Sequence, residues 1–228
     1  MSPTQVALVT GANRGLGLEI SRQLAQRGFL VLMGARCLDQ GQTAAKQLAD
    51  QGLPVRAVQL DVTSTRDMEQ LREQIEMEFG KLDILVNNAA ILLDINVQPS
   101  EVTEELLRES FEVNFFGPYL LTQRMVGLLA RSGKGRVVNM DTGVASLTQL
   151  ADPHSPLKDD VCPAYQTSKA ALNALTLVFA KELRNAGVKV NSACPGWVMT
   201  EMGHEDLPDY GDAARPKTVE EGVDTPVW

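Results

Sequence analysis

The sequence predicts a single doubly wound α/β domain, with a mostly or wholly parallel sheet flanked by helices. Short runs that are apolar throughout alternate with stretches of helical periodicity from the first residues onward. Such runs are typical of strands covered by helices on both faces, and strand–helix–strand order requires parallel pairing. The 228 residues, 44% hydrophobic and 22% charged, contain no repeat, low-complexity tract or linker. Residues 1–228 are therefore expected to form one domain.

The individual elements follow from the same alternation. The six expected strands are residues 6–9, 29–33, 55–60, 82–86, 136–140 and 188–192. The first three helices between them are expected at residues 16–27, 40–50 and 68–79. Hydroxyl side chains that can cap helix N-termini precede the third and fourth helices. They are Thr63, Ser64 and Thr65 for the third, and Ser100 and Thr103 for the fourth.

The C-terminal segment starts a further helix. Val219, Val223 and Val227 recur at helical spacing, but a last strand after the sixth is absent. Either the sheet is complete with fewer strands than a longer chain would supply, or the chain is truncated.

Composition and charge exclude several classes of function. The net charge of −8, from 29 acidic and 21 basic side chains, repels phosphate backbones and disfavours a nucleic-acid partner. No apolar run is long enough to span a bilayer, and residues 1–5 lack the basic start of a signal peptide. Three widely spaced cysteines without a C-x-x-C pair indicate a reduced, cytoplasmic protein. Two histidines exclude a His-rich metal centre, so no metal is expected.

A glycine-rich turn follows the first strand. Gly11, Gly15 and Gly17 are spaced G-x-x-x-G-x-G between that strand and the first helix. Glycines there let the backbone turn sharply and approach a pyrophosphate, and the free N–H groups of the helix start attract its charge. A tight strand-to-helix turn without a ligand is the alternative. Because the strand–turn–helix context is the one that a dinucleotide site requires, we favour the binding interpretation.

Further motifs repeat along the chain in a fixed order. They are Thr10-Gly11 with the glycines above, Asp61-Val62, Asn87-Asn88-Ala89, Asn114, Tyr165-x-x-x-Lys169 and Pro195-Gly196 followed by Thr200. In this order and spacing the chain resembles the short-chain dehydrogenase/reductase family, whose first fingerprint is T-G-x-x-x-G-x-G. Within that family it is most similar to NADP-dependent carbonyl reductases. The resemblance covers nearly the whole chain and implies a Rossmann-like fold.

Charge at the second strand indicates which dinucleotide binds. A carboxylate at that strand end would bond the ribose diol of NAD and repel a 2′-phosphate. Here the strand ends at Arg36, and no carboxylate follows until Asp39. Guanidinium groups bind phosphate bidentately, and Arg14 and Arg36 can converge on the adenosine end. We therefore expect NADP(H), with NAD(H) disfavoured; two ordinary surface arginines are the alternative.

The resemblance also implies a set of cofactor contacts. They are Gly11, Asn13, Arg14, Gly15, Leu16, Gly17, Arg36, Asp61, Val62, Asn88, Ala89, Ala90, Tyr165, Lys169, Pro195, Gly196, Val198 and Thr200. Asp61 and Val62 would flank the adenine, and Thr200 would reach the nicotinamide carboxamide. Asp61 has an alternative as a helix-entry residue. Ala90 stands where the family usually has glycine, and an alanine requires negative φ there.

The catalytic residues are expected near the start of a long helix. Carbonyl reduction needs a hydride, which is the cofactor's chemistry, and a proton donor, for which Tyr165 is the candidate. An ordinary tyrosine has a pKa of about 10. Lys169, one helical turn later, can lower it and hold the nicotinamide ribose. By the resemblance, Asn114 would hold a water in a proton relay.

The fourth catalytic position departs from the family pattern. After the fifth strand the family usually has V-N-x-S-S, and the second serine polarises the substrate carbonyl. Here Thr142 falls at that position behind Asp141 and keeps a hydroxyl donor, with Ser146 as the fallback. The stretch from Thr142 to Tyr165 is longer than usual, and a similar, larger insertion marks monomeric carbonyl reductases. A monomer or a homodimer is therefore expected.

The substrate is expected to be a small apolar aldehyde, ketone or quinone, reduced reversibly to the alcohol. Loops at about 143–162 and 201–217 would form the walls of its pocket. Apolar side chains that suggest this substrate, or that pack in the core instead, are Leu147, Leu150, Trp197, Met199 and Met202. A different class of function is a non-catalytic NADP(H)-binding sensor or interaction protein. Thr142 and the absent last strand motivate this alternative.

Overall fold

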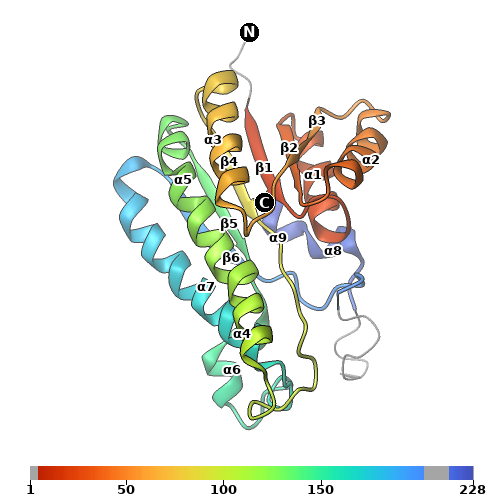
Figure 1. Cartoon of the computed structure of the whole chain (residues 1–228), viewed down its shortest axis with the longest axis vertical. Helices are drawn as coiled ribbons and strands as arrows, with labels where there is room; N and C mark the ends of the chain where they lie inside the picture. The colour runs from red at the N-terminus through yellow and green to blue at the C-terminus, as the bar shows by residue number, and fades with distance from the viewer. Residues whose placement is uncertain (1–4, 203–215, 228) are drawn as a thin grey trace.

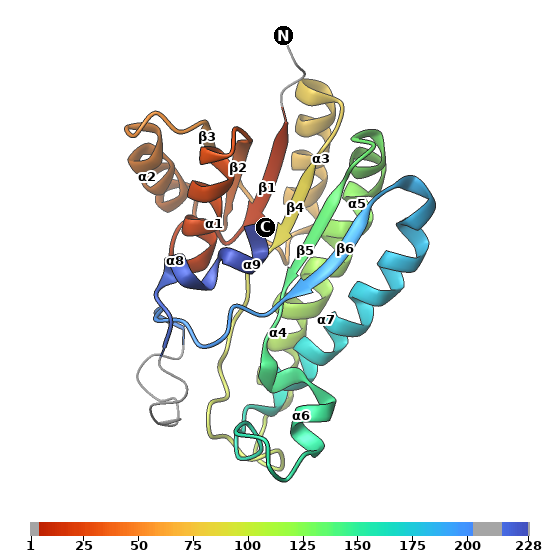
Figure 2. The ribbon, with the colours of Figure 1, turned by 180° about the vertical axis from the view of Figure 1, so that it is seen from behind.

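The computed structural model describes residues 5–202 and 216–227. In these residues six strands form one sheet in the order β3-β2-β1-β4-β5-β6, and every pairing is parallel (Figures 1 and 2). The strands are β1 (Val6–Thr10), β2 (Leu30–Ala35), β3 (Val55–Gln59), β4 (Ile84–Asn87), β5 (Arg136–Met140) and β6 (Lys189–Ala193). The expected doubly wound α/β class is confirmed. No seventh strand occurs in the described ranges, where β6 stays at the sheet edge.

Helices cover both faces of the sheet. The main helices are α1 (Gly15–Gln26), α2 (Leu38–Ala49), α3 (Thr65–Phe79), α4 (Glu104–Phe111), α5 (Gly117–Arg131) and α7 (Pro163–Glu182). The shorter ones are the π-helix η1 (Glu112–Phe116), the 3₁₀ turns η2 (Gly143–Ala145) and η3 (Leu183–Ala186), α6 (Leu147–Ala151), α8 (Val219–Gly222) and α9 (Asp224–Val227). None of those described is long and apolar enough to cross a membrane.

Two hydrophobic cores, one on each face, explain why the strands are apolar throughout. On one face, Leu8 and Leu32 pack with buried side chains of α3, α5 and α7. On the other, Val9 packs with α1, α2 and the C-terminal residues Val223 and Val227. Because neighbouring residues of a strand point to opposite faces, both must be apolar when both faces are covered.

Capping side chains fix several helix starts. Ser64 accepts a hydrogen bond from Asp67 N at the start of α3, and Thr103 accepts one from Leu106 N at the start of α4. Both lie within the groups expected from the sequence, whereas Ser100 lies before the cap of α4. Thr218 and Glu221 form a capping box that starts α8. The C-terminal helical pattern therefore forms two short helices.

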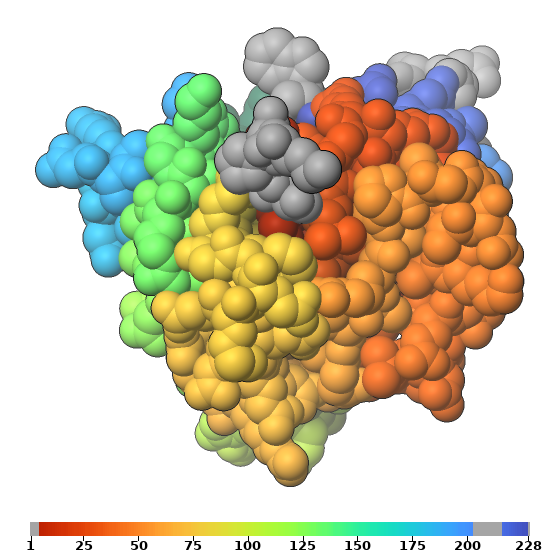
Figure 3. All heavy atoms as spheres, turned by 90° about the horizontal axis from the view of Figure 1, so that it is seen from above, coloured from red at the N-terminus to blue at the C-terminus, as the bar shows by residue number. Residues whose placement is uncertain are grey.

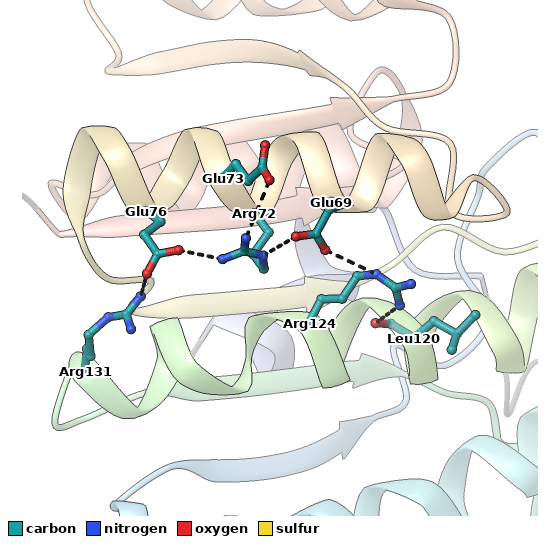
Figure 4. Close-up of polar contacts among 7 residues, drawn as sticks. All are labelled: Glu69, Arg72, Glu73, Glu76, Leu120, Arg124 and Arg131. Atoms are coloured by element: carbon teal, nitrogen blue, oxygen red, sulfur yellow. Dashed lines mark hydrogen bonds and ion pairs between the residues drawn. The ribbon is translucent and has the colours of Figure 1, made fainter.

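A chain of ion pairs joins α3 to α5 on the outside of the molecule (Figure 4). Arg72 lies between Glu69 and Glu76 of its own helix, and Glu76 also accepts from Arg131 of α5, with N–O distances of 2.5 to 2.8 Å. Arg124 of α5 approaches Glu69 at 3.8 Å. These pairs are solvent-accessible, so their contribution is small and screened by salt. They join the outer faces of two helices that already pack through apolar side chains.

The strands all run in the same direction, and this direction determines at which end of the sheet a ligand site is expected. The carboxyl ends of β1, β4 and β5 meet in the lower half of Figures 1 and 2, where the loops after them gather. Figure 3 shows the opposite end, where the strands begin and the turns after α2 (orange) and α3 (yellow) lie. In open α/β sheets ligands bind outside the carboxyl ends, beside the point where strand order reverses. Here that point lies between β1 and β4.

Candidate active site

A cleft of about 680 Å³ opens at this reversal point. It is lined by Gly11, Asn13, Arg14, Gly15, Leu16, Gly17, Arg36, Leu60, Asp61, Val62, Thr63, Asn88, Ala89, Ala90, Ile91, Arg108, Glu109, Glu112, Val113, Met140, Asp141, Tyr165, Lys169, Pro195, Thr200, Glu201 and Met202. These residues follow the carboxyl ends of all six strands or lie on α4, η1 and α7. The sequence motifs, which are far apart in the chain, therefore meet in one cavity.

The glycine turn has no room for side chains at Gly11 and Gly17. A Cβ on Gly17 would lie 2.3 Å from the carbonyl oxygen of Gly11 and 2.6 Å from Asn88 Nδ2. Gly11 itself has φ +62°, and Asn88 Nδ2 donates to the carbonyls of Thr10 and Gly11 at 2.9 and 3.2 Å. Only glycine fits a backbone that is both left-handed and in contact with its neighbours. The asparagine of the Asn-Asn-Ala motif thus holds the turn closed.

The first turn of α1 is open to the cleft. Arg14 is its N-cap but makes no side-chain cap, and the first turn contains no acidic residue. Gly15, at φ +53°, lines the cleft, and a Cβ there would approach Thr200 at 3.7 Å. Uncapped N–H groups at a helix start attract anions. The residues present therefore fit a bound pyrophosphate, with Gly15 leaving space for it.

The two predicted phosphate-binding arginines both line the cleft. Arg14 is exposed and forms an ion pair with Glu201, which belongs to the segment after β6. Arg36 is exposed at the end of β2, and its carbonyl accepts from Gln59. Asn13 donates to Gln40 at 3.2 Å. Glu201 therefore takes the place beside Arg14 that an anionic ligand group would also take.

The positions of Asp61 and Ala90 are compatible with the roles considered for them in the sequence, and their cofactor contacts stay predictions. Asp61 lines the cleft, and its Oδ1 also accepts from the N–H and the hydroxyl of Thr63 at 2.9 and 2.8 Å. The carboxylate thus organises the entry to α3 as well. Ala90 lines the cleft too, and its φ is negative, since Asn96 is the one described non-glycine residue with positive φ.

Tyr165 and Lys169 lie one turn apart on α7 and both line the cleft. Lys169 is 2% exposed; its Nζ donates to the Met140 carbonyl at 2.8 Å and lies 5.7 Å from the centre of the Tyr165 ring. Burial lowers the pKa of Lys169 to about 8, against an opposing effect of Asp141. Burial raises the pKa of Tyr165, and nearby Cys162 and Asp141 act in the same direction.

This direction differs from the expectation that Lys169 would lower the pKa of Tyr165. The cause is desolvation, which disfavours the charged form of both groups. The lysine is itself taken out of water, and its ammonium is directed at a backbone carbonyl rather than at the phenol. In the protein alone, Tyr165 is thus held as the neutral phenol, the form that can donate a proton.

Asn114 lies behind the cleft rather than in its wall. It is fully buried in the π-helix η1, a type of turn that occurs frequently at functional sites. Its Oδ1 accepts from Ile91 N at 2.9 Å, and its Nδ2 donates to Ile91 O at 2.9 Å and to Ser168 Oγ at 3.1 Å. The side chain therefore fastens the loop after β4 to α7, and the water relay stays a prediction.

Thr142 and Asp141 follow β5. Thr142 is not among the cleft-lining residues; its hydroxyl accepts from Val144 N at 3.4 Å and caps η2. Asp141 lines the cleft, and its Oδ2 accepts from Asn173 of α7 at 2.6 Å. Burial raises the pKa of Asp141. The carboxyl that the sequence marks as a departure thus lies just after β5 and interacts electrostatically with Lys169.

Of the remaining predicted positions, some line the cleft and others do not. Gly196 and Val198 do not line the cleft; Val198 is buried and its backbone bridges to Lys217. No described residue between 143 and 162 lines it, whereas Glu201 and Met202 do. The part of the other expected loop at 203–215 lies outside the described residues. The pocket-wall predictions for both loops stay predictions.

Sequence reasoning missed several cleft residues. They are Leu60, Thr63, Ile91, Arg108, Glu109, Glu112 and Val113. Four of them lie on α4 and η1, where charged side chains at helical spacing look like an ordinary solvated face. The signal available was position: Ile91 and Thr63 directly follow recognised motifs at strand ends. The surrounding backbone, not the residue type, brings them to the cavity.

The comparisons with known proteins show the family of the chain. The family model for short chain dehydrogenases matches residues 5–211. The chain belongs to the short-chain dehydrogenase family.

Among members of this family, carbonyl reductase [NADPH] 1 of Sus scrofa is 33% identical over 265 aligned residues, which cover 100% of this chain and 87% of that protein. The (+)-neomenthol dehydrogenase of Arabidopsis thaliana is 30% identical, covering 97% and 89%. Among solved structures, an alcohol dehydrogenase of the archaeon Thermococcus sibiricus, complexed with 5-hydroxy-NADP, superposes with a TM-score of 0.80 at 28% identity. That match covers 98% of this chain and 89% of the other.

Proposed function

We propose that this short-chain dehydrogenase is an NADP(H)-dependent reductase that converts the carbonyl of a small apolar aldehyde, ketone or quinone to the alcohol, reversibly. The observation that carries the proposal is the placement of Tyr165 and Lys169 in the cleft that begins at the glycine turn. A relative named as an NADPH carbonyl reductase, similar over the full chain, supports the reaction class. A related structure holding an NADP derivative supports the cofactor.

Each end of the cofactor would have its own residues. The open first turn of α1 would hold the pyrophosphate, and Arg14 and Arg36 would bind the 2′-phosphate. Lys169 would hold the nicotinamide ribose, and Thr200, across the glycine turn, would reach the carboxamide. When bound, the nicotinamide supplies the hydride.

Protons would be handled by this chain's own side chains. Tyr165 would donate its phenolic proton to the substrate oxygen, and its raised pKa keeps it protonated near neutral pH. The positive charge of Lys169 would then stabilise the tyrosinate left behind. Thr142 would polarise the carbonyl, which requires its hydroxyl to turn from Val144 toward the cleft. Asn114 would support the relay that returns a proton to Tyr165.

Tyr165→Phe tests the chemistry. Loss of the general acid should lower kcat about 10²- to 10⁴-fold while the dissociation constant of NADPH stays near that of the wild type. The measurement is NADPH fluorescence, followed as decay with a panel of aldehydes, ketones and quinones and as a binding titration. Tyr119→Phe, on α5 outside the cleft, is the matched control and should be silent. Wild-type binding of NADPH without turnover on any carbonyl would favour the non-catalytic sensor instead.

The arginines test the cofactor. Arg14→Ala and Arg36→Ala should each raise KM for NADPH by roughly tenfold or more, as expected for a lost charge-assisted phosphate contact, and leave KM for NADH nearly unchanged. Arg66→Ala, on α3 and outside the cleft, controls for general loss of positive charge. Equal effects on both cofactors would contradict the assignment of the 2′-phosphate to these side chains.

A further inference from the structure

The helix that carries Tyr165 starts without a cap of its own. Its N-cap, Cys162, makes no side-chain hydrogen bond, and its first turn contains no acidic residue. Pro163 follows as the first helical residue and has no N–H. The first N–H groups that need a partner are therefore those of Ala164 and Tyr165, and the helix start is buried here, with Ala164 fully inaccessible.

Asp94, from the loop after β4, provides the acceptor oxygens for both N–H groups. Its Oδ2 accepts from Ala164 N at 2.5 Å, and its Oδ1 lies 3.4 Å from Tyr165 N. The Asp94 side chain is 0% exposed, and in the described part of the chain no lysine or arginine forms an ion pair with it. A buried carboxylate without a cation needs another source of positive potential, and the start of a helix provides one. Asp94 therefore caps α7 from a distant segment.

The loop that brings Asp94 to this place is fixed at both ends. Asn114 bonds both the N–H and the carbonyl of Ile91, three residues earlier. Asn96, two residues later, has φ +59° and donates its N–H to the Val161 carbonyl at 2.8 Å. Positive φ is uncommon for a non-glycine residue, although asparagine adopts it more readily than most. The carboxylate is thus presented by a segment that hydrogen bonds hold on both sides.

The contacts form a closed ring around the Tyr165 backbone. Asp94 holds its N–H, and Ser168 Oγ donates to its carbonyl at 2.8 Å. Ser168 in turn accepts from Asn114, whose other bonds return to the Asp94 loop at Ile91.

We propose that Asp94 is a positioning residue that fixes Tyr165 by capping α7 from the loop after β4. This inference rests on the proposed reductase function only for its kinetic consequence; the cap itself does not. Without the carboxylate, the first turn of α7 opens more often and the phenol is less often in line with the substrate oxygen. The glycine turn and the arginines stay in place, so cofactor binding is preserved. Asp94 thereby acts chiefly on the first turn of α7, which carries the proton donor.

The test compares Asp94→Ala and Asp94→Asn with the wild type in three measurements. Amide hydrogen exchange of Ala164 and Tyr165, resolved by NMR, should speed up roughly 3- to 30-fold in Asp94→Ala, the effect of losing a helix cap. At saturating NADPH, kcat should fall about 10- to 100-fold, as a small misplacement of a catalytic group does. The dissociation constant of NADPH should stay within twofold or so. Asp94→Asn keeps one acceptor oxygen and should recover part of kcat, staying several-fold below the wild type.

Ser64→Ala is the matched control. It removes a cap of the same kind from α3, and it should lower stability without changing kcat or exchange in α7. Wild-type exchange at Ala164 and Tyr165 in both Asp94 variants overturns the cap. Faster exchange with unchanged kcat, or an equal loss of kcat in Ser64→Ala, overturns the positioning role.

If Asp94→Ala does not fold, the isosteric Asp94→Asn must itself show faster exchange and a several-fold lower kcat, or the inference fails. A wild type without turnover contradicts the reductase and leaves the exchange measurement to decide the cap.

Discussion

At Lys169, burial and an attractive neighbour act in opposite directions. Desolvation lowers the pKa to about 8, and Asp141 opposes it. The hydrogen bond to the Met140 carbonyl gives the ammonium one partner in a nearly fully buried position. The sequence identified both Tyr165 and Lys169 from their spacing. It could not show the direction of their pKa values, because that depends on how deeply the finished fold buries them.

Lys169→Met tests how the lowered pKa of Lys169 affects the pH dependence of the free energy of unfolding. The unfolded chain holds the lysine proton up to a pKa near 10.5, and the folded chain only up to about 8. Between these values the unfolded wild type binds more protons, so its free energy of unfolding rises with pH. Relative to wild type, the Met variant should therefore lose on the order of 3 kcal/mol between pH 8 and 10.5, since one pKa unit is about 1.4 kcal/mol.

Urea unfolding of the cofactor-free protein across this pH range measures the difference. Lys46→Met, which removes an exposed lysine of α2, is the control and should give a constant difference from wild type. A constant difference for Lys169→Met as well would mean that the buried lysine does not lose its proton in the folded state before the unfolded state does.

At the scale of elements, the sequence predicted what is encoded locally. Apolar runs located all six strands to within one or two residues, and capping hydroxyls located the starts of α3 and α4. The site residues recognised were those in motifs at strand ends. Asp94 and the α4 residues at the cleft carry no local signal, because what they do depends on which distant segment packs against them. The apolar and capping patterns likewise do not predict the π-helix that contains Asn114.

The effect of an added methyl group on stability differs between two helical glycines, because their surroundings differ. Gly17→Ala, in α1, would place a Cβ 2.3 Å from the Gly11 carbonyl, so the glycine turn must move. We expect a loss of about 2 kcal/mol or more, as for overpacking, and much weaker NADPH binding. At Gly127, an exposed position of α5, an added Cβ would meet no atom nearer than 3.9 Å. Gly127→Ala should therefore stabilise the folded protein by roughly 0.5–1 kcal/mol. Thermal unfolding and an NADPH titration of both variants measure these effects, and the same sign of stability change in both would contradict the steric argument.

At the scale of the whole molecule, the C-terminal segment closes the second core. The chain returns from β6 past Val198, bridges at Lys217, and places α8 and α9 beside α1 (Figure 2). A Cβ on Gly222 would lie 2.6 Å from Val198 and 3.1 Å from Leu16. Leu16 lines the cleft. The last helices therefore support the same turn that would hold the cofactor, and sheet, cleft and C-terminal helices should unfold as one unit.

Val223→Ala tests whether the molecule unfolds as one cooperative unit. Val223 is 0% exposed in the core between α1 and the sheet. Removing two buried methyl groups should cost about 2 kcal/mol, which lowers Tm by roughly 4–8 °C in a chain of this size. If the molecule is one cooperative unit, loss of secondary structure by circular dichroism and loss of NADPH binding must shift together along the same urea curve. Val178→Ala, exposed on α7, should move neither. A Val223→Ala variant that releases NADPH at lower urea than it loses its helices would show that the C-terminal segment opens on its own, and that the cofactor turn depends on a part of the fold less stable than the sheet.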